Sequence, residues 1–329
     1  MTESSATSRP RIGFIGLGGM GSRMASRLVS AGYRVTAYDR RHDRTEQLRQ
    51  RGAEPAESPG AVAASVDIVL SSVTDDAALE AVMYGESGVL GAARPGSVII
   101  DMSTVRPRTS ARLFNVGRKS GIAVLDAPVS GSLPQAEQGE LVIFVGGERS
   151  VYDSCLRIFS ELGKAAFYLG PSGAGTSAKL CANALLALGL QALGEAVALG
   201  ERAGVPRERL LEALAETAVI SPSQRSKFDN ITRDDYPATF PLRLMFKDLS
   251  LILQEALDLS VAMPATAAAA QVAAVEHARE TALRVDEDSS AVIRQLVMWA
   301  EPAGPDAYRL IDNSERAEAI EREMTDNLP

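Results

Sequence analysis

A glycine-rich turn near the start of the chain has the spacing of a loop that binds the pyrophosphate of a dinucleotide. The pattern G-x-G-x-x-G follows the apolar run 12–15 and precedes a helix-like segment, which is the context that this motif requires. Glycines there allow a tight turn and a close approach of the phosphates, whose charge the helix N-terminus stabilises. The predicted cofactor loop consists of Gly16, Leu17, Gly18, Gly19, Met20 and Gly21.

An acidic residue stands where such a fold contacts the adenosine ribose. Asp39 follows Gly21 by 18 residues, at the end of the second predicted strand, and its carboxylate can accept hydrogen bonds from ribose hydroxyls. A carboxylate repels a 2′-phosphate, so we expect NAD to be preferred. NADP stays possible because Arg40 and Arg41 follow directly and could partly accommodate that phosphate, although such a pair is also common in a solvated loop.

A second group capable of chemistry combines a lysine and an asparagine. Lys179 and Asn183 lie four residues apart in a helix-like segment, so their side chains share one face. A lysine near a helix start is more often a surface charge, and the helix N-terminus disfavours a cation. Spacing alone therefore leaves open whether this pair is functional.

The other proton carriers of dehydrogenases are poorly represented. His42 lies beside the predicted cofactor loop and His277 in a late alanine-rich segment, and neither is well placed as an acid or base. No tyrosine is followed four residues later by lysine, which excludes the short-chain pattern. Cys155 and Cys181 with two histidines do not supply a zinc ligand set, so no metal is expected. A lysine or a carboxylate is left to carry the proton.

Short β-rich runs alternate with helix-like stretches from about residue 11 to residue 170. This alternation is typical of a mostly parallel sheet covered by helices on both faces, with ligands at the carboxyl ends of the strands. The expected fold class is α/β, a Rossmann-type doubly wound sheet followed by an all-helical second domain. The predicted strands are 12–15, 34–38, 67–71, 97–101, 122–126 and 141–145.

The chain after residue 170 loses this alternation and consists of Ala- and Leu-rich segments at helical period. A helix is predicted from near Thr176 to Ala203, and polar breaks in its apolar part, 180–199, favour a buried helix over a membrane span. Four segments follow from these patterns. They are a flexible tail (1–10), an NAD(P)-binding Rossmann domain (11–171), a helical substrate and oligomerisation domain (172–300) and a polar C-terminal tail (301–329).

Composition limits the partners and the location. Hydrophobic residues make up 46% and charged residues 23% of the chain, as in ordinary globular proteins. The net charge of −8 disfavours nucleic acid and an anionic membrane surface, which leaves a small molecule as the expected partner. Two cysteines without a C-x-x-C pair, and a polar N-terminus without a signal peptide, fit a cytoplasmic location. Extensive apolar helix surface predicts a homodimer or a homotetramer.

Several sequence blocks, taken in order, resemble the β-hydroxyacid dehydrogenase family, which includes 3-hydroxyisobutyrate dehydrogenase, tartronate semialdehyde reductase and the glyoxylate and succinic semialdehyde reductases. The resemblance spans about residues 11–293. Its main blocks are the glycine turn, Asp126-Ala127-Pro128-Val129-Ser130-Gly131-Ser132, the segment from Gly175 to Asn183, and the segment from Phe240 to Asp248. Shorter matches are 101–104 and 288–291.

This resemblance implies a role for each matching residue. Lys179 would be the catalytic lysine and Asn183 its hydrogen-bonding partner, while Lys247 would lie near both the nicotinamide and the substrate. A lysine can protonate the alkoxide that forms as hydride reaches a carbonyl. The substrate would be held by Ser130, Gly131, Ser132 and Phe240, the first three binding its carboxylate. The nicotinamide half of the cofactor would be lined by Ser72, Val73 and Thr104.

Two positions depart from the family's pattern. Ala182 replaces the first of two asparagines that commonly follow the lysine, and Ser132 gives Ser-Gly-Ser where Ser-Gly-Gly is commoner. The Ser-Gly-Ser form resembles the glyoxylate and succinic semialdehyde reductases, whereas Asp39 resembles the NAD-using members. Asp248 and Asp288 are interpreted as organising structure, because carboxylates at helix starts or beside a lysine usually do so.

The expected function is hydride transfer between NAD(P) and a short-chain 3-hydroxy acid or its semialdehyde. One alternative is an NAD(P)H-dependent imine reductase. Lys179 disfavours this alternative, because such relatives usually lack the lysine. The other is a non-catalytic cofactor-binding module, which retention of both Lys179 and Asn183 disfavours. An ordinary lysine pKa of about 10.4 predicts that oxidation accelerates toward alkaline pH.

Overall fold

Residue contacts divide the protein into two compact units. The computed structural model describes residues 9–283 and 286–300. Among the described residues, one unit runs up to Gly189 and also includes Pro237–Ser289, and the other consists of Leu190–Tyr236 and 290–300. The predicted C-terminal tail, 301–329, and most of the predicted N-terminal tail lie outside the described residues. The division into four segments stays a prediction.

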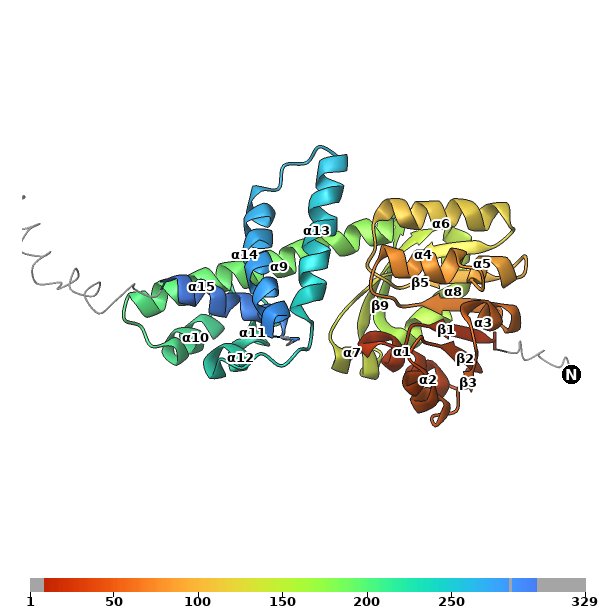
Figure 1. Ribbon diagram of the computed structural model, residues 1–329, viewed down its shortest axis with the longest axis horizontal. Coiled ribbons are helices and arrows are strands. Elements are labelled where there is room, and N and C mark those ends of the chain that lie inside the picture. Colours follow the sequence, from red (N-terminus) through yellow and green to blue (C-terminus); the bar gives the residue numbers. More distant parts are fainter. Residues whose placement is uncertain (1–8, 284–285, 301–329) are drawn as a thin grey trace, which may run out of the picture. The chain divides into compact units, whose positions relative to one another are not determined.

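The first unit is built on a nine-stranded sheet (Figure 1). The strand order is β3-β2-β1-β4-β5-β6-β8-β7, and β9 also pairs with β8. The six strands from β3 to β6 in this order are mutually parallel, whereas β8 runs antiparallel to β6 and β7. The strands are β1 Ile12–Ile15, β2 Val35–Tyr38, β3 Glu54–Pro55, β4 Ile68–Ser71, β5 Val98–Asp101, β6 Ala123–Asp126, β7 Val129–Ser130, β8 Leu141–Gly147 and β9 Gly163–Gly170. This order is that of the doubly wound Rossmann fold, which confirms the expected fold class.

Eight helices connect these strands. Their starts carry recognisable signals: Ser58 accepts a hydrogen bond from the Ala61 amide, Asp75 accepts one from the Ala78 amide, and Pro107 opens its helix. The helices are α1 Gly19–Ser30, α2 His42–Arg49, α3 Pro59–Ser65, α4 Asp76–Tyr84, α5 Val89–Ala92, α6 Pro107–Lys119, α7 Leu133–Gln138 and α8 Arg149–Leu162.

The central strands are apolar on both faces because helices cover both faces of the sheet. Phe14 and Leu70 belong to a core that includes buried side chains of α1, α2 and α8. A second core, with side chains of α3, α4 and α6, contains the neighbouring strand residues Ile15 and Val69. The continuous apolar runs in the sequence therefore become buried parallel strands.

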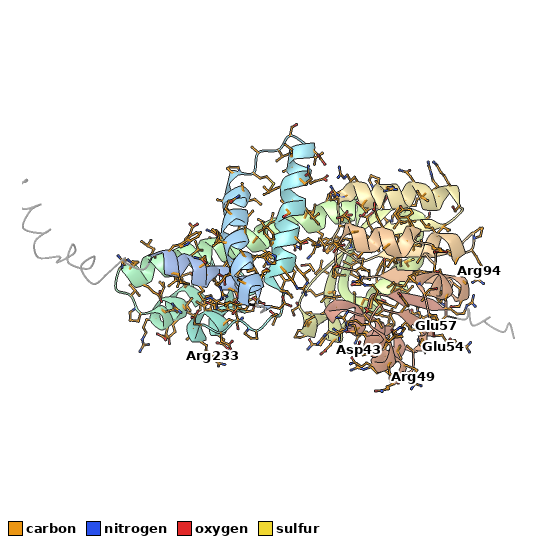
Figure 2. The ribbon with its side chains drawn as sticks, viewed as in Figure 1. Asp43, Arg49, Glu54, Glu57, Arg94 and Arg233 are labelled. Atoms are coloured by element: carbon orange, nitrogen blue, oxygen red, sulfur yellow. The ribbon has the colours of Figure 1, made fainter. Side chains whose placement is uncertain are left out.

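The six predicted strands are confirmed, with starts that differ from the expected ones by at most one residue. Three further strands, β3, β7 and β9, were not expected. Two of them are only two residues long, and β3 combines the exposed Glu54 with Pro55 at the edge of the sheet (Figure 2). A proline lacks the N–H that a further strand would require, and a charge discourages edge pairing, so such a strand leaves no clear sequence signal.

The first unit also contains the start of a long helix and two further helices. The long helix is α9, Ala174–Arg202, and the others are α13 Leu242–Asp258 and α14 Pro264–Leu283. In the described chain α9 is the one helix that is long and apolar enough to cross a membrane by length and composition, which is weak evidence by itself. Less than half of its most apolar window is buried, so the expectation of a buried helix is only partly met.

The second unit consists of the remainder of α9 and several short helices. Close packing explains two small residues of α9: a Cβ on Gly194 would lie 2.6 Å from Leu296, and one on Gly200 would lie 2.4 Å from Leu210. Its other elements are α10 Arg207–Ala215, α11 Pro222–Arg225, α12 Phe228–Arg233 and α15 Val292–Ala300, preceded by the 3-10 turn Ser289–Ala291. No strand is formed after Gly170 in the described residues, as the sequence predicts, although two isolated bridges occur near 237–241.

Candidate active site

The glycine turn joins β1 to α1 where the strand order reverses, between β1 and β4. Gly16 has a φ of 90°, and a Cβ there would lie 2.2 Å from the carbonyl oxygen of Ser72. A Cβ on Gly21 would lie 2.0 Å from the carbonyl oxygen of Gly16. The packing of the turn itself therefore requires glycine at both positions.

Packing within the described protein does not require glycine at position 18. Its φ is negative, and no described atom lies within 4 Å of a Cβ placed on it. It is the N-cap residue of α1, and no side chain caps the first N–H groups of this helix. Free space beside the N-terminus of a helix fits the pyrophosphate of a dinucleotide, because its charge is stabilised there and the backbone can approach closely.

Asp39 links the glycine turn to the loop after β2. Its carboxylate is buried and accepts hydrogen bonds from the backbone N–H of Leu17 at 2.7 Å and of Arg41 at 2.9 Å. Arg44 lies 3.5 Å away, and Arg41 forms an ion pair with Asp43. Arg40 is exposed and forms no ion pair among the described residues. The site therefore presents a carboxylate and one free guanidinium where the adenosine ribose of a dinucleotide would lie.

A buried network holds the loop after β4 in place. The hydroxyls of Ser71 and Ser103 each donate to Oδ1 of Asp101 at 2.7 Å, and Oγ of Ser103 accepts a hydrogen bond from the Val73 amide at 2.9 Å. Burial raises the pKa of Asp101 to about 6. This network holds the loop that lies beside Gly16 through Ser72 and Val73.

Lys247, in the first turns of α13, meets Thr104. Its ammonium donates to the Thr104 carbonyl oxygen at 2.6 Å and lies 2.8 Å from Oδ1 of Asp248. The other oxygen of Asp248 accepts a hydrogen bond from Nδ2 of Asn183 at 2.5 Å. Asp248 is almost completely buried; one of its oxygens is paired with the charge of Lys247 and the other accepts from Asn183. Residues from three distant parts of the sequence therefore form one cluster.

Lys179 lies beside this cluster, one helical turn before Asn183 on α9. It is partly buried, and no hydrogen-bond acceptor contacts its ammonium in the described part of the chain. Burial lowers the pKa of Lys179 to about 8, while nearby Asp248 opposes and Lys247 adds to this shift. The pKa of Lys179 therefore lies below the ordinary lysine value of about 10.4, which was the reference used for the sequence, because the sequence does not show how far the side chain is desolvated. A lysine with this pKa can exchange protons near neutral pH.

The predicted substrate residues begin at the end of β7 and lead into α7. Ser130 pairs with Val142 of β8, and Gly131 has a φ of 150°. The backbone N–H and the hydroxyl of Ser132 both donate to Oε1 of Gln135, as in a capping box at the start of α7. No direct contact between these residues and Lys179 is found among the described residues. The substrate roles predicted for them stay predictions.

Phe240 precedes α13 and is held by a buried carboxylate. Oδ2 of Asp288 accepts hydrogen bonds from the amides of Thr239 and Phe240 and from the hydroxyl of Thr239. Asp288 therefore organises the loop that carries Phe240, in line with its interpretation from the sequence. No hydrogen bond or ion pair joins Phe240 to Lys179 among the described residues, and the role of Phe240 stays a prediction.

Three carboxylates of this region were not among the predicted site residues. Two of them, Asp101 and Asp126, end strands, and the third, Asp248, lies beside Lys247. Each forms a hydrogen bond with a residue 30 to 65 positions away in the sequence. The positions of Asp101 and Asp126 at strand ends were visible in the sequence, but the partners of all three carboxylates were not. A single sequence gives no information on which distant polar groups meet.

Comparison with known proteins agrees with this geometry. Residues 11–170 match the family model described as the NAD binding domain of 6-phosphogluconate dehydrogenase. Residues 173–296 match the model described as NAD-binding of NADP-dependent 3-hydroxyisobutyrate dehydrogenase. The 2-(hydroxymethyl)glutarate dehydrogenase of Eubacterium barkeri is 36% identical over 295 residues, which cover 89% of this chain and 96% of that protein. The chain belongs to the β-hydroxyacid dehydrogenase family.

Other members support the assignment to β-hydroxyacid dehydrogenases. Glyoxylate/succinic semialdehyde reductase 1 of Arabidopsis thaliana is 34% identical over 282 residues, covering 86% of this chain and 96% of the reductase. The structure of 3-hydroxyisobutyrate dehydrogenase from Mycobacterium tuberculosis with L-serine is 27% identical, has a TM-score of 0.78, and covers 87% of this chain and 99% of its own. This β-hydroxyacid dehydrogenase is therefore an NAD(P)-dependent oxidoreductase of the hydroxyacid dehydrogenase and semialdehyde reductase type.

Proposed function

We propose that the protein interconverts a short-chain 3-hydroxy acid and its semialdehyde, with Lys179 exchanging the proton. The observation that carries this proposal is the partly buried Lys179 beside the cluster of Asn183, Lys247 and Asp248, in a chain of this family. Its ammonium has no acceptor among the described residues, so a substrate oxygen can take that place. The three known relatives named above act on small molecules that carry a carboxylate, which supports the choice of substrate class.

The proton transfer follows from the state of Lys179. In the oxidative direction its neutral amine accepts the proton of the substrate hydroxyl, the C–H bond of the same carbon breaks, and a C=O double bond forms. The nicotinamide, when bound, accepts the hydride in this direction and supplies it in the other. Asn183 donates to Asp248, which leaves its side-chain oxygen to accept a hydrogen bond from the substrate hydroxyl or from Lys179. In reduction the Lys179 ammonium returns its proton to the oxygen.

The substrate carboxylate is assigned to the loop after β7. Ser130 contributes a hydroxyl and Gly131 a backbone N–H, both of which can donate to an anion. Ser132 contributes less, because its own N–H and hydroxyl already donate to Gln135. Phe240 would contact the carbon skeleton, and the loop that carries it is fixed by Asp288.

NAD is the proposed cofactor, with NADP as a weaker one. The buried carboxylate of Asp39 supports this preference because it would lie against a 2′-phosphate. The two carboxylate oxygens each accept one backbone N–H and retain lone pairs for ribose hydroxyls. Arg40 is free to contact a phosphate, which supports some use of NADP.

Replacing the carboxylate should change this preference. In Asp39→Asn the side-chain oxygen can still accept from Leu17, but the negative charge is lost and Arg40 and Arg44 face the ribose unopposed. We expect the ratio of kcat/KM for NAD to that for NADP to fall by roughly tenfold to a hundredfold, since a charge interaction is worth about 1.5–3 kcal/mol. Glu46→Gln, which removes an exposed charge further along α2, is the control. An unchanged ratio in Asp39→Asn would assign cofactor choice to other residues.

The pH dependence of the reaction should report the lowered pKa of Lys179. Oxidation needs the neutral amine, so kcat/KM for the hydroxy acid should rise with pH, with a midpoint near 8, and level off above it. Reduction needs the ammonium, so its rate should fall through the same range. Steady-state rates in both directions between pH 6 and pH 10 provide the measurement. A profile without a bend in this range would show that Lys179 does not carry the proton.

The reaction itself is tested with a substrate panel followed at 340 nm. NAD and NADP are each offered with 3-hydroxyisobutyrate, 3-hydroxypropionate, glycerate, 4-hydroxybutyrate and threonate, and the reduced cofactors with the matching aldehydes and with a cyclic imine. Turnover of a 3-hydroxy acid or its semialdehyde is the expected result. Turnover of the imine alone, or cofactor binding without any turnover, would contradict the proposal.

We also propose a homodimer or homotetramer in the cytoplasm. Exposed apolar side chains support the assembly, including Leu257, Leu259 and Val261 around the end of α13 and Leu185 on α9. Light scattering that returns the mass of a single chain would refute it. Two free cysteines, Cys155 and Cys181, support a reducing compartment.

A further inference from the structure

Asp126 is a buried carboxylate to which the proposed reaction assigns no role. It ends β6, is 1% exposed, and precedes Ser130 by four residues. Its oxygens accept three hydrogen bonds from the start of α9. Oδ1 accepts from the Gly173 amide at 2.8 Å, and Oδ2 accepts from the amide and the hydroxyl of Thr176, both at 2.9 Å. Asp126 therefore caps the helix that carries Lys179.

The cap comes from the sheet rather than from the residues next to the helix. Ser172 is the nearest local candidate, but its hydroxyl is buried and has no hydrogen-bond partner in the described chain. The first N–H groups of a helix need acceptors, and a carboxylate there is favoured by the partial positive charge of the helix start. A cap supplied by a preceding residue stabilises a helix wherever the helix lies. A cap supplied by a strand also fixes where the helix begins relative to that strand.

Packing around Asp126 leaves little room for the helix start to move. A Cβ on Gly175 would lie 2.4 Å from the carbonyl oxygen of Phe144 and 2.7 Å from that of Asp126. A Cβ on Gly146 would lie 2.7 Å from Oδ1 of Asp126. Thr176 is completely buried, and its hydroxyl also lies 3.0 Å from that of Ser110. The glycines thus bring the backbone of α9 into direct contact with β6 and β8.

Thr176 and Lys179 are three residues apart on α9, so they lie on neighbouring turns of one face. A slip of the helix by one residue would move Lys179 by about 1.5 Å along the axis and rotate it by about 100°. We propose that Asp126 is a positioning residue, which fixes the start of α9 against the end of β6 and thereby sets Lys179 relative to Ser130 and Gly131. This inference rests on the proposed function, because Lys179 and the loop after β7 act together only in that reaction.

Asp126→Asn tests the inference with little change in shape. The new amide NH₂ cannot accept from the helix start, so we expect kcat to fall by about tenfold to a hundredfold, as displacements near 1 Å do in other active sites. The Kd for NAD should stay within about twofold, because the glycine turn and Asp39 are untouched. Thr176→Val, which removes one of the three bonds, should lower kcat less, and Thr176→Ser should retain the wild-type value.

The matched control is another helix cap outside the site. Ser58→Ala removes the acceptor for the Ala61 amide at the start of α3 and should lower Tm while kcat stays unchanged. If Asp126→Asn likewise lowers Tm but retains the wild-type kcat, Asp126 is only a structural cap and the inference is wrong. If Asp126→Asn does not fold, a wild-type kcat in Thr176→Val overturns it instead.

A readout without substrate separates this inference from the proposed function. The chain has only five lysines, so their titration can be followed by NMR after ¹³C-methylation, with Lys179 assigned from Lys179→Arg. We expect the Lys179 midpoint to move in Asp126→Asn, because its distance from Asp248 and Lys247 changes. An unchanged midpoint contradicts the inference. Inactivity of the wild type on the whole substrate panel would instead contradict the proposed function.

Discussion

Lys179→Met should lower kcat in both directions by about a thousandfold or more and leave the Kd for NAD within about twofold. Methionine fills a similar volume but cannot carry a proton, and Lys179 makes no hydrogen bond that holds the described structure together. Burial already disfavours its charge, so loss of the ammonium should not lower stability. Steady-state kinetics in both directions, with NAD binding measured by fluorescence titration, provide the test.

Two further variants show which property of Lys179 matters. Lys179→Arg retains a positive charge but cannot release a proton near neutral pH, so it should be almost as inactive as Lys179→Met. Activity close to wild type in Lys179→Arg would mean that Lys179 acts only through its charge. Lys164→Met removes an exposed lysine from β9 and should leave kcat unchanged. A loss of NAD binding in Lys179→Met that equals the loss of kcat would make Lys179 a structural residue.

Gly18→Val should weaken NAD binding by roughly a hundredfold while the protein keeps its fold. The backbone of Gly18 is extended, with a φ of −66° and a ψ of −169°, and the space around its Cβ position is open among the described residues. Valine therefore fits the protein, but it would occupy the place where a pyrophosphate meets the start of α1. Loss of about two charge-assisted hydrogen bonds to phosphate accounts for the expected size of the effect.

Gly91→Val is the matched control for Gly18→Val. Gly91 lies in α5 and also has no described atom within 4 Å of its Cβ position, but it lies outside the glycine turn. The Kd of the Gly91→Val variant for NAD should equal that of the wild type. Isothermal titration calorimetry measures binding, and circular dichroism checks the fold of both variants. Wild-type affinity in a folded Gly18→Val would mean that the cofactor phosphates do not approach this glycine.

Much of the fold followed from local sequence patterns. Mostly apolar runs of four residues form β1, β4 and β5. Such a run is enough to predict a strand that is buried on both faces of a sheet. The strand β3 was missed because its pairing depends on a neighbour rather than on its two residues. The helix α9 begins two residues before the predicted start, since its cap, Asp126, is supplied by a strand about 50 residues earlier.

The sequence by itself determined the types of chemical group and their local spacing. It placed the glycine turn before a helix, a carboxylate after the second strand, and Lys179 one turn from Asn183, because each of these relations spans only a few residues or one βαβ unit. The tertiary structure alone decided that Asp248 joins Asn183 to Lys247 and that the pKa of Lys179 falls to about 8. Both depend on burial and on distances between distant residues, which no local pattern encodes.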